Sequence, residues 1–170
     1  MTDRPQDYLF NPTQHAALHP GQSAVITSLS GREAGVMGAL HPQVSKNLNI
    51  NKIPLLFEMV LEEIKGSQLP RFRETSKFPT IRRDLAVIVD DAISSAAVQQ
   101  EIREAAGALL KQVHLFDVYK GKGIDSGKKS LALGLTLQDS SRTLTDGDVD
   151  IVMERVLTRL RDNFGATLRD

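Results

Sequence analysis

Three stretches in the second half of the chain carry apolar residues at every second position. They cover residues 85–89, 115–119 and 130–137, and their alternation predicts β-strands that each turn one face to a core. The first strand is entered through Phe78-Pro79 and two arginines, and it runs into two aspartates. A short last strand is expected at residues 167–169.

Between these strands the apolar spacing becomes helical. One helix is expected from Ser94 or Ser95 to about Gln112. A second helix is predicted to start at Thr145, with Asp148 closing a capping box, and to end at Gly165. The two predicted apolar stripes are Val98, Ile102, Ala105, Leu109 and Val113, and Val149, Val152, Val156, Leu160 and Phe164.

The resulting order is β-α-β-β-α-β, the ferredoxin-like arrangement of the α+β class. Two helices cover only one face of an antiparallel sheet, so the other face is left open. An open face needs a partner, and its side chains indicate the kind of partner. We therefore assign residues 78–170 to a ferredoxin-like domain whose function lies on its open face.

The first part of the chain has a weaker pattern. Residues 1–22 are expected to be irregular because Asn-Pro and His-Pro pairs are turn signals. Strands are predicted at 22–28, 34–40 and 54–61, with a short helix at 42–48. Three strands bury little apolar surface, so residues 1–65 are expected to be the end of a larger antiparallel sheet that continues upstream. Residues 66–77, rich in Gly, Ser, Pro and basic side chains, are expected to be a linker.

Composition narrows the classes of function. The chain is 41% hydrophobic, balances 21 basic against 21 acidic side chains and has no cysteine, which excludes a disordered chain and thiolate metal sites. It has no apolar run long enough for a membrane span and no secretory leader, so a cytoplasmic protein without a membrane partner is expected. With zero net charge, binding of nucleic acid requires a local patch.

Alternation assigns the strand side chains of residues 78–170 to two faces. The core face is predicted to carry Leu85, Val87, Val89, Phe116, Val118, Leu131, Leu133 and Leu135. The open face is predicted to carry Ala86, Ile88, Leu115, Asp117, Tyr119, Ser130, Ala132, Gly134 and Thr136.

The open face suits an RNA base. Tyr119 offers a ring for stacking, Asp117 can accept hydrogen bonds from guanine, and Ser130 can donate or accept one. Small residues such as Ala86 leave room for something flat. RNA, and not DNA, is the expected partner. Candidates for phosphate contacts are Arg82, Arg83, Lys120, Lys122, Lys128 and Lys129.

A different class of function stays open on these residues alone. A ferredoxin-like module that binds a regulatory ligand, or that only assembles with another domain, can bury the same face. The Gly/Lys loop at 120–129 is not a P-loop, because it lacks Gly-Lys-Ser/Thr before a helix. The four histidines lack metal-ligand spacing and no nucleophile elbow is present, so neither a metal site nor a catalytic residue is expected.

Several segments resemble a single family. Residues 78–86, 116–119, 128–132 and 143–146 resemble the ferredoxin-fold anticodon-binding domain at the C-terminal end of bacterial phenylalanine–tRNA ligase β subunits. Residues 18–24 and 38–42 are similar to the module that precedes this domain. That module is like a class II synthetase core but is not catalytic.

The resemblance implies that the chain is a C-terminal fragment that binds the anticodon stem-loop of phenylalanine tRNA. The guanine at the first anticodon position is then expected to stack on Tyr119, to bond to Asp117 and Ser130, and to lie against Ala86. The family enzyme joins phenylalanine to tRNA with ATP and magnesium, as an (αβ)2 assembly with its activating site in the α subunit. No cofactor and no catalytic residue are expected in this fragment.

Overall fold

A computed structural model describes residues 8–64 and 76–169 of the chain. The chain divides into two compact units, residues 1–72 and 73–170, which are treated separately below. Most of the linker predicted at 66–77 lies outside the described residues, as do residues 1–7 of the segment predicted to be irregular.

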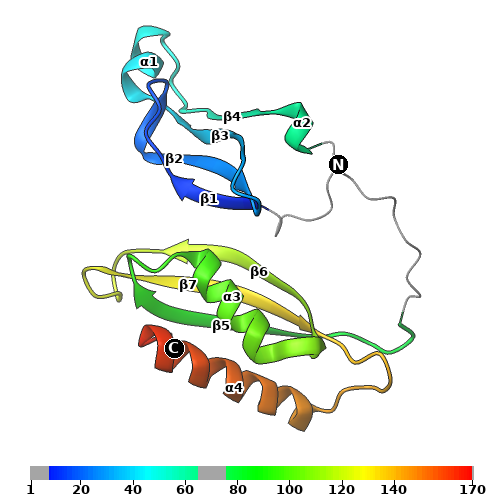
Figure 1. The fold of residues 1–170 in the computed structure, drawn as a ribbon. Helices are drawn as coiled ribbons and strands as arrows, with labels where there is room; N and C mark the ends of the chain where they lie inside the picture. The colour runs from blue at the N-terminus through cyan, green and yellow to red at the C-terminus, as the bar shows by residue number, and fades with distance from the viewer. Residues whose placement is uncertain (1–7, 65–75, 170) are drawn as a thin grey trace. The chain divides into compact units, whose positions relative to one another are not determined.

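The second unit has the predicted β-α-β-β-α-β order (Figure 1). Its sheet has the strand order β6-β7-β5-β8, all neighbours are antiparallel, and α3 and α4 lie on the same face of the sheet. The ferredoxin-like fold is thereby confirmed. Its elements are β5 (Ile81–Asp90), α3 (Ser95–Ala106), a 3₁₀ turn (Gly107–Leu109), β6 (Leu110–Tyr119), β7 (Lys128–Leu137), α4 (Asp146–Phe164) and β8 (Thr167–Leu168).

The core of this unit lies between the sheet and the two helices. Every second residue of β7, from Leu131 to Leu137, is fully buried, and β5 contributes Leu85, Val87 and Val89 as predicted. The helices add their predicted apolar stripes, among them Val98, Ile102, Val149, Val152, Val156 and Leu160. Burying a Val or Leu side chain stabilises a fold by roughly 1.5–3 kcal/mol, so this layer dominates the stability of the unit.

Helix α4 begins at a complete capping box. The Thr145 hydroxyl accepts a hydrogen bond from the Asp148 amide at 3.3 Å, and the Asp148 carboxylate accepts one from the Thr145 amide at 2.9 Å. Arg142 donates two further hydrogen bonds to that carboxylate, at 2.7 and 2.8 Å. Arg142, and next the Thr145 bonds, hold the pKa of Asp148 far below its ordinary value. The helix ends at Gly165, as predicted, in the left-handed conformation that glycine adopts readily.

The first predicted helix is too long by about six residues. Helix α3 ends at Ala106 because Gly107 adopts a positive φ of 62° and its amide donates to the Arg103 carbonyl. After a 3₁₀ turn the chain enters β6, so Val113 lies in a strand rather than on a helix face. Val113 is nevertheless buried in the same core, which is why its apolar character fitted both interpretations.

A β-bulge in β6 changes the predicted faces of two residues. Leu115 pairs with Leu133 and Asp117 pairs with the next residue of β7, Ala132, so Phe116 is an extra residue. Leu115, predicted on the open face, packs against the core instead. Phe116, predicted inward, is 49% exposed. Val118 pairs with core residue Leu131 as expected but stays 50% exposed on this edge strand.

The first unit is a four-stranded antiparallel sheet with the order β1-β2-β3-β4. The expectation that residues 1–22 are irregular is wrong for Tyr8–Pro12, which form edge strand β1, and for the start of β2. An edge strand tolerates the proline that suggested a turn, because one side of it needs no amide donors. The elements are β1 (Tyr8–Pro12), β2 (Leu18–Ser28), β3 (Glu33–Leu40), α1 (Pro42–Asn47), β4 (Leu55–Met59) and α2 (Leu61–Ile64).

This unit buries few apolar side chains. Among its described residues the buried hydrophobic ones are Leu18, Ile26, Ala34, Ala39 and Leu40. Strand β4 has no buried residue, and its Leu55 and Phe57 are each 77% exposed. The sheet therefore presents apolar surface to its surroundings over the length of an edge strand.

Candidate nucleic-acid interface

The four predicted base-contacting residues lie in two neighbouring cross-strand rows on the open face. In one row Tyr119 of β6 pairs with Ser130 of β7, which pairs with Ile88 of β5. In the next row Asp117 pairs with Ala132, which pairs with Ala86. Rows two residues apart along a strand are separated by about 7 Å, so the four residues border one compact patch.

The Tyr119 ring is held in place by the loop that follows it. Its hydroxyl donates a hydrogen bond to the Lys122 carbonyl at 3.2 Å. Gly121 has a positive φ, and a Cβ atom there would lie 2.9 Å from the Tyr119 hydroxyl oxygen. The glycine therefore lets the loop approach the edge of the ring closely. The Gly/Lys loop thus positions an aromatic side chain, a role that the sequence interpretation did not assign to it.

Arg169 is a residue of this patch that sequence reasoning missed. The carbon of its guanidinium lies 4.7 Å from the centre of the Tyr119 ring, which is a cation–π contact. Its backbone amide donates to the Ala86 carbonyl at 3.0 Å. Ser130, between these elements, is only 2% exposed. No sequence pattern connects Arg169 with Tyr119, which lie fifty residues apart.

The other missed residue is Phe116, toward the opposite end of the open face. The Arg82 guanidinium lies 6.0 Å from the centre of its ring and donates a hydrogen bond to Asp84 at 3.0 Å. Gly134 lies beneath, where a Cβ atom would meet both Arg82 and Asp84 within 3.3 Å. The bulge therefore adds a second exposed ring to the face that carries Tyr119.

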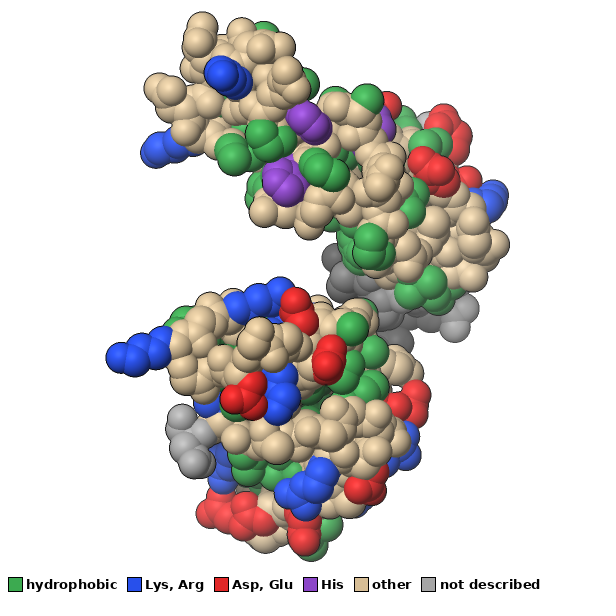
Figure 2. Space-filling model, turned by 90° about the vertical axis from the view of Figure 1, so that its left-hand side faces the viewer, with side chains coloured by type: hydrophobic (Ala, Val, Ile, Leu, Met, Phe, Trp, Pro, Cys, Tyr) green, Lys and Arg blue, Asp and Glu red, His purple; other side chains and the backbone are tan. Residues whose placement is uncertain are grey.

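Asp117 and the predicted phosphate contacts differ in their surroundings. Asp117 is exposed and has no hydrogen-bond or ion-pair partner among the residues that the structure describes. Most of the six cations are paired with carboxylates, and Figure 2 shows Lys and Arg next to Asp and Glu over the surface of this unit. The pairs are Arg82–Asp84, Arg83–Asp146, Lys120–Asp91, Lys128–Asp125 and Lys129–Asp91.

Two of these cations are poorly placed for a ligand on the open face. Arg83 lies on the helix side of β5, where its guanidinium contacts Asp146 in the first turn of α4 at 2.8 Å. The Lys129 side chain is only 13% exposed and donates to the Asp91 carbonyl at 2.8 Å. Lys120, and then Lys129, lower the pKa of the Asp91 carboxyl. Within the described residues only Lys122 of the six has no carboxylate partner.

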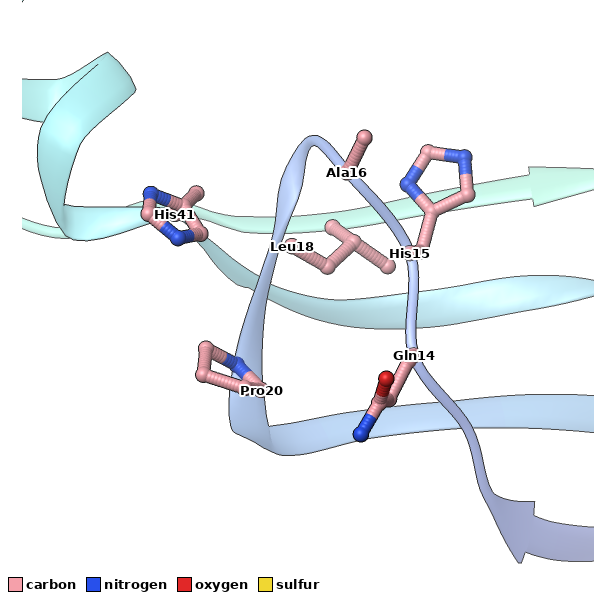
Figure 3. A pocket seen from close by; sticks show the side chains of 6 residues that line it. All are labelled: Gln14, His15, Ala16, Leu18, Pro20 and His41. Atoms are coloured by element: carbon pink, nitrogen blue, oxygen red, sulfur yellow. The ribbon is translucent and has the colours of Figure 1, made fainter.

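The first unit contains a pocket of about 320 Å³ between the end of β1 and the start of α1. Figure 3 shows Leu18 between His41 and His15 in this pocket. The Nδ1 atoms of His15, His19 and His41 each accept a hydrogen bond from a backbone amide two residues further on, at 3.0–3.3 Å. These histidines therefore close turns and cap α1. In residues 8–64 and 76–169 no three His, Asp or Glu side chains gather as metal ligands would, and no helix is long and apolar enough to cross a membrane.

Two protein families match the chain. The ferredoxin-fold anticodon binding domain matches residues 76–169. The phenylalanyl tRNA synthetase beta chain CLM domain matches residues 2–61. Together they cover the two units, with the candidate interface inside the first-named match.

Relatives resemble nearly the whole chain. Phenylalanine–tRNA ligase beta subunits are 50% identical in Pseudomonas syringae pv. tomato, over 96% of this chain, and 46% identical in Coxiella burnetii, over 99%. The protein of that name in Vibrio vulnificus is 44% identical over 96% of the chain. The matched regions are 20% of the Pseudomonas and Vibrio proteins and 21% of the Coxiella protein, so this chain spans about a fifth of their length.

Proposed function

The chain belongs to the phenylalanine–tRNA ligase β-subunit family, and from that premise we propose that its second unit binds the anticodon stem-loop of phenylalanine tRNA. The observation that carries the proposal is the pair of cross-strand rows on the open face. They bring Tyr119, Asp117, Ser130 and Ala86 around one patch, although these residues come from three strands.

The chemistry of the patch suits guanine at the first anticodon position. A base stacked on Tyr119 extends over the neighbouring row, where Ala86 and Ala132 have no side chain large enough to block it. Asp117 offers carboxylate oxygens to the amino and imino groups of guanine, and adenine, cytosine and uracil lack that pair of adjacent donors. Stacking supplies affinity that tolerates any base, and Asp117 supplies the preference for guanine.

The fragment recognises RNA and catalyses no step by itself under this proposal. ATP and magnesium are used by the whole ligase, which joins phenylalanine to its tRNA as an (αβ)2 assembly in the cytoplasm. The activating site is proposed to lie in the α subunit.

The test is titration of the 170-residue chain with a phenylalanine-tRNA anticodon stem-loop and with one whose first anticodon base is changed. Binding should weaken when the base is changed. Replacing Tyr119 by Ala should cost about 1–3 kcal/mol of binding free energy, because base–aromatic stacking has that size. Tyr8→Ala, which removes the other tyrosine of the chain, is the matched control and should leave affinity unchanged. Equal binding of the two RNAs would contradict base recognition.

A further inference from the structure

Arg169 reaches the patch from the far side of the sheet. It follows β8, whereas Tyr119 ends β6, and the strand order places β7 and β5 between them. Three strand spacings are about 14 Å. Because the guanidinium and the ring are only 4.7 Å apart, the two side chains extend toward each other across the open face. They therefore pass over Ser130 and Ile88, which lie in the same row as Tyr119.

This arrangement covers the place where a base would stack. Ser130 has a small polar side chain on an otherwise open sheet face, yet it is 2% exposed. The guanidinium occupies one side of the Tyr119 ring, and Gly121 and the Lys122 carbonyl lie at its hydroxyl end. A base that stacks on Tyr119 and bonds to Ser130 must therefore move Arg169 outward.

We propose that Arg169 is a fifth base-contacting residue, whose guanidinium stacks on the outer face of the base bound to Tyr119. The inference rests on the proposed function and adds a residue to the same site. The base is then held between a tyrosine ring on the sheet and an arginine plane above it. Guanidinium planes stack on bases as aromatic rings do, so the contact that Arg169 makes with Tyr119 is replaced by one of the same kind.

The movement required is small and the backbone permits it. Two van der Waals contacts need about 7 Å between the ring and the guanidinium, so Arg169 has to withdraw by roughly 2–3 Å. The hydrogen bond that the Arg169 backbone amide donates to the Ala86 carbonyl keeps the backbone beside the patch while the side chain moves. Strand β8 has only two residues, Thr167 and Leu168, and lies at the edge of the sheet formed by the described strands. The long side chain can therefore swing without disturbing the core.

The experiment compares Arg169→Ala with Arg103→Ala in the 170-residue chain. Both variants remove one positive charge, but Arg103 lies on α3, on the helix-covered side. Each is titrated with the anticodon stem-loop and with a stem-loop that lacks only the first anticodon base. Arg169→Ala should weaken binding of the intact RNA about 3- to 30-fold and leave binding of the abasic RNA unchanged. Arg103→Ala should change neither, and Arg169→Lys should restore little because it lacks the plane.

Opposite results overturn the inference in distinct ways. Unchanged or tighter binding by Arg169→Ala would show that Arg169 only occupies the place of the base. An equal loss on intact and abasic RNA would show a phosphate contact instead. If the unsubstituted chain fails to distinguish the two RNAs, the proposed function fails and the inference fails with it. If Tyr119→Ala shows a base-dependent loss and Arg169→Ala shows none, the proposed function stands and only the role of Arg169 is refuted.

Discussion

The two units share one architecture, a four-stranded antiparallel sheet, but differ in what covers it. The second unit has helices of twelve and nineteen residues over its sheet, and eighteen of the buried hydrophobic residues among the described residues belong to its core. The first unit has helices of six and four residues, and its described part contributes five. The second unit is therefore stabilised from within, whereas much of the apolar surface in the described part of the first unit is exposed.

The exposed sheet surfaces differ in chemistry as well. Across β2, β3 and β4 of the first unit, Ala24, Met37 and Phe57 lie in register, with Leu55 beside them. The open face of the second unit carries small and polar residues together with the rings of Tyr119 and Phe116. An apolar sheet is stabilised by packing against another apolar surface, whereas a polar one with small side chains leaves room for a flat ligand. We propose that the same kind of sheet serves for assembly in one unit and for recognition in the other, according to its outward side chains.

The largest effect should come from a matched pair of leucine substitutions. Leu133→Ala empties a fully buried position and should lower the free energy of unfolding of the second unit by about 2–5 kcal/mol. Leu55→Ala changes a side chain that is 77% exposed and should cost less than about 0.5 kcal/mol. Urea unfolding, with hydrogen exchange to separate the two units, measures both. Similar losses at the two positions would refute the contrast between the units.

Acid should destabilise the second unit more than the first. The carboxyl groups with lowered pKa values among the described residues are Asp91, Asp139 and Asp148, all in the second unit. A pKa that is lower in the folded state stabilises the fold above the unfolded value near 4, and this stabilisation is lost as pH falls below it. The urea midpoint of the second unit should therefore drop between about pH 5 and pH 2. Asp148→Asn should flatten that drop, and an unchanged slope would show that the capping box contributes nothing.

The smallest effect should be the salt dependence of RNA binding. Five of the six predicted phosphate contacts are already paired with carboxylates, which leaves Lys122 and Arg169 as the cations of the interface without a described carboxylate partner. Because Arg169 is proposed to contact the base, one phosphate neutralisation, by Lys122, is expected, and on single-stranded RNA it gives a slope of about −0.7 for log K against log salt. Lys122→Ala should reduce its size by about 0.7. Titrations at four salt concentrations measure the slope, and a value steeper than about −4 would show that the ion pairs open on binding.

Much of the second unit was predictable because its periodicities are unambiguous. Alternation in β5 and β7 identified both faces correctly, and Thr145, Asp148 and Gly165 marked the ends of α4 through local chemistry. The end of α3 was also encoded, in Gly107, but the apolar residues Leu109 and Val113 continued the helical spacing by chance. Local signals predict well where only one interpretation satisfies them.

The missed features depend on pairing between distant segments. The bulge at Phe116 is defined by which residue of β7 lies opposite, and strand β1 exists because β2 pairs with it. Arg169 meets Tyr119 only after four strands have been placed in order. Likewise the positive charge of Arg83 suggested a phosphate contact, but its position in β5 turns its side chain to the helix side of the sheet, where it contacts Asp146. Composition cannot distinguish such alternatives, because the deciding contacts are not local.

Without its bulge, the extra residue in β6 would act on the strand as a frame shift acts on a coding sequence. A strand is read in steps of two, so one inserted residue would send every later side chain to the opposite face. The bulge absorbs Phe116, so that Leu115 keeps its place in the core while Asp117 and Tyr119 keep theirs beside Ala132 and Ser130. Deleting Phe116 would leave both halves of the strand in frame. Deleting Val118 would instead turn Tyr119 toward the core face and bring Lys120 to the open face in its place.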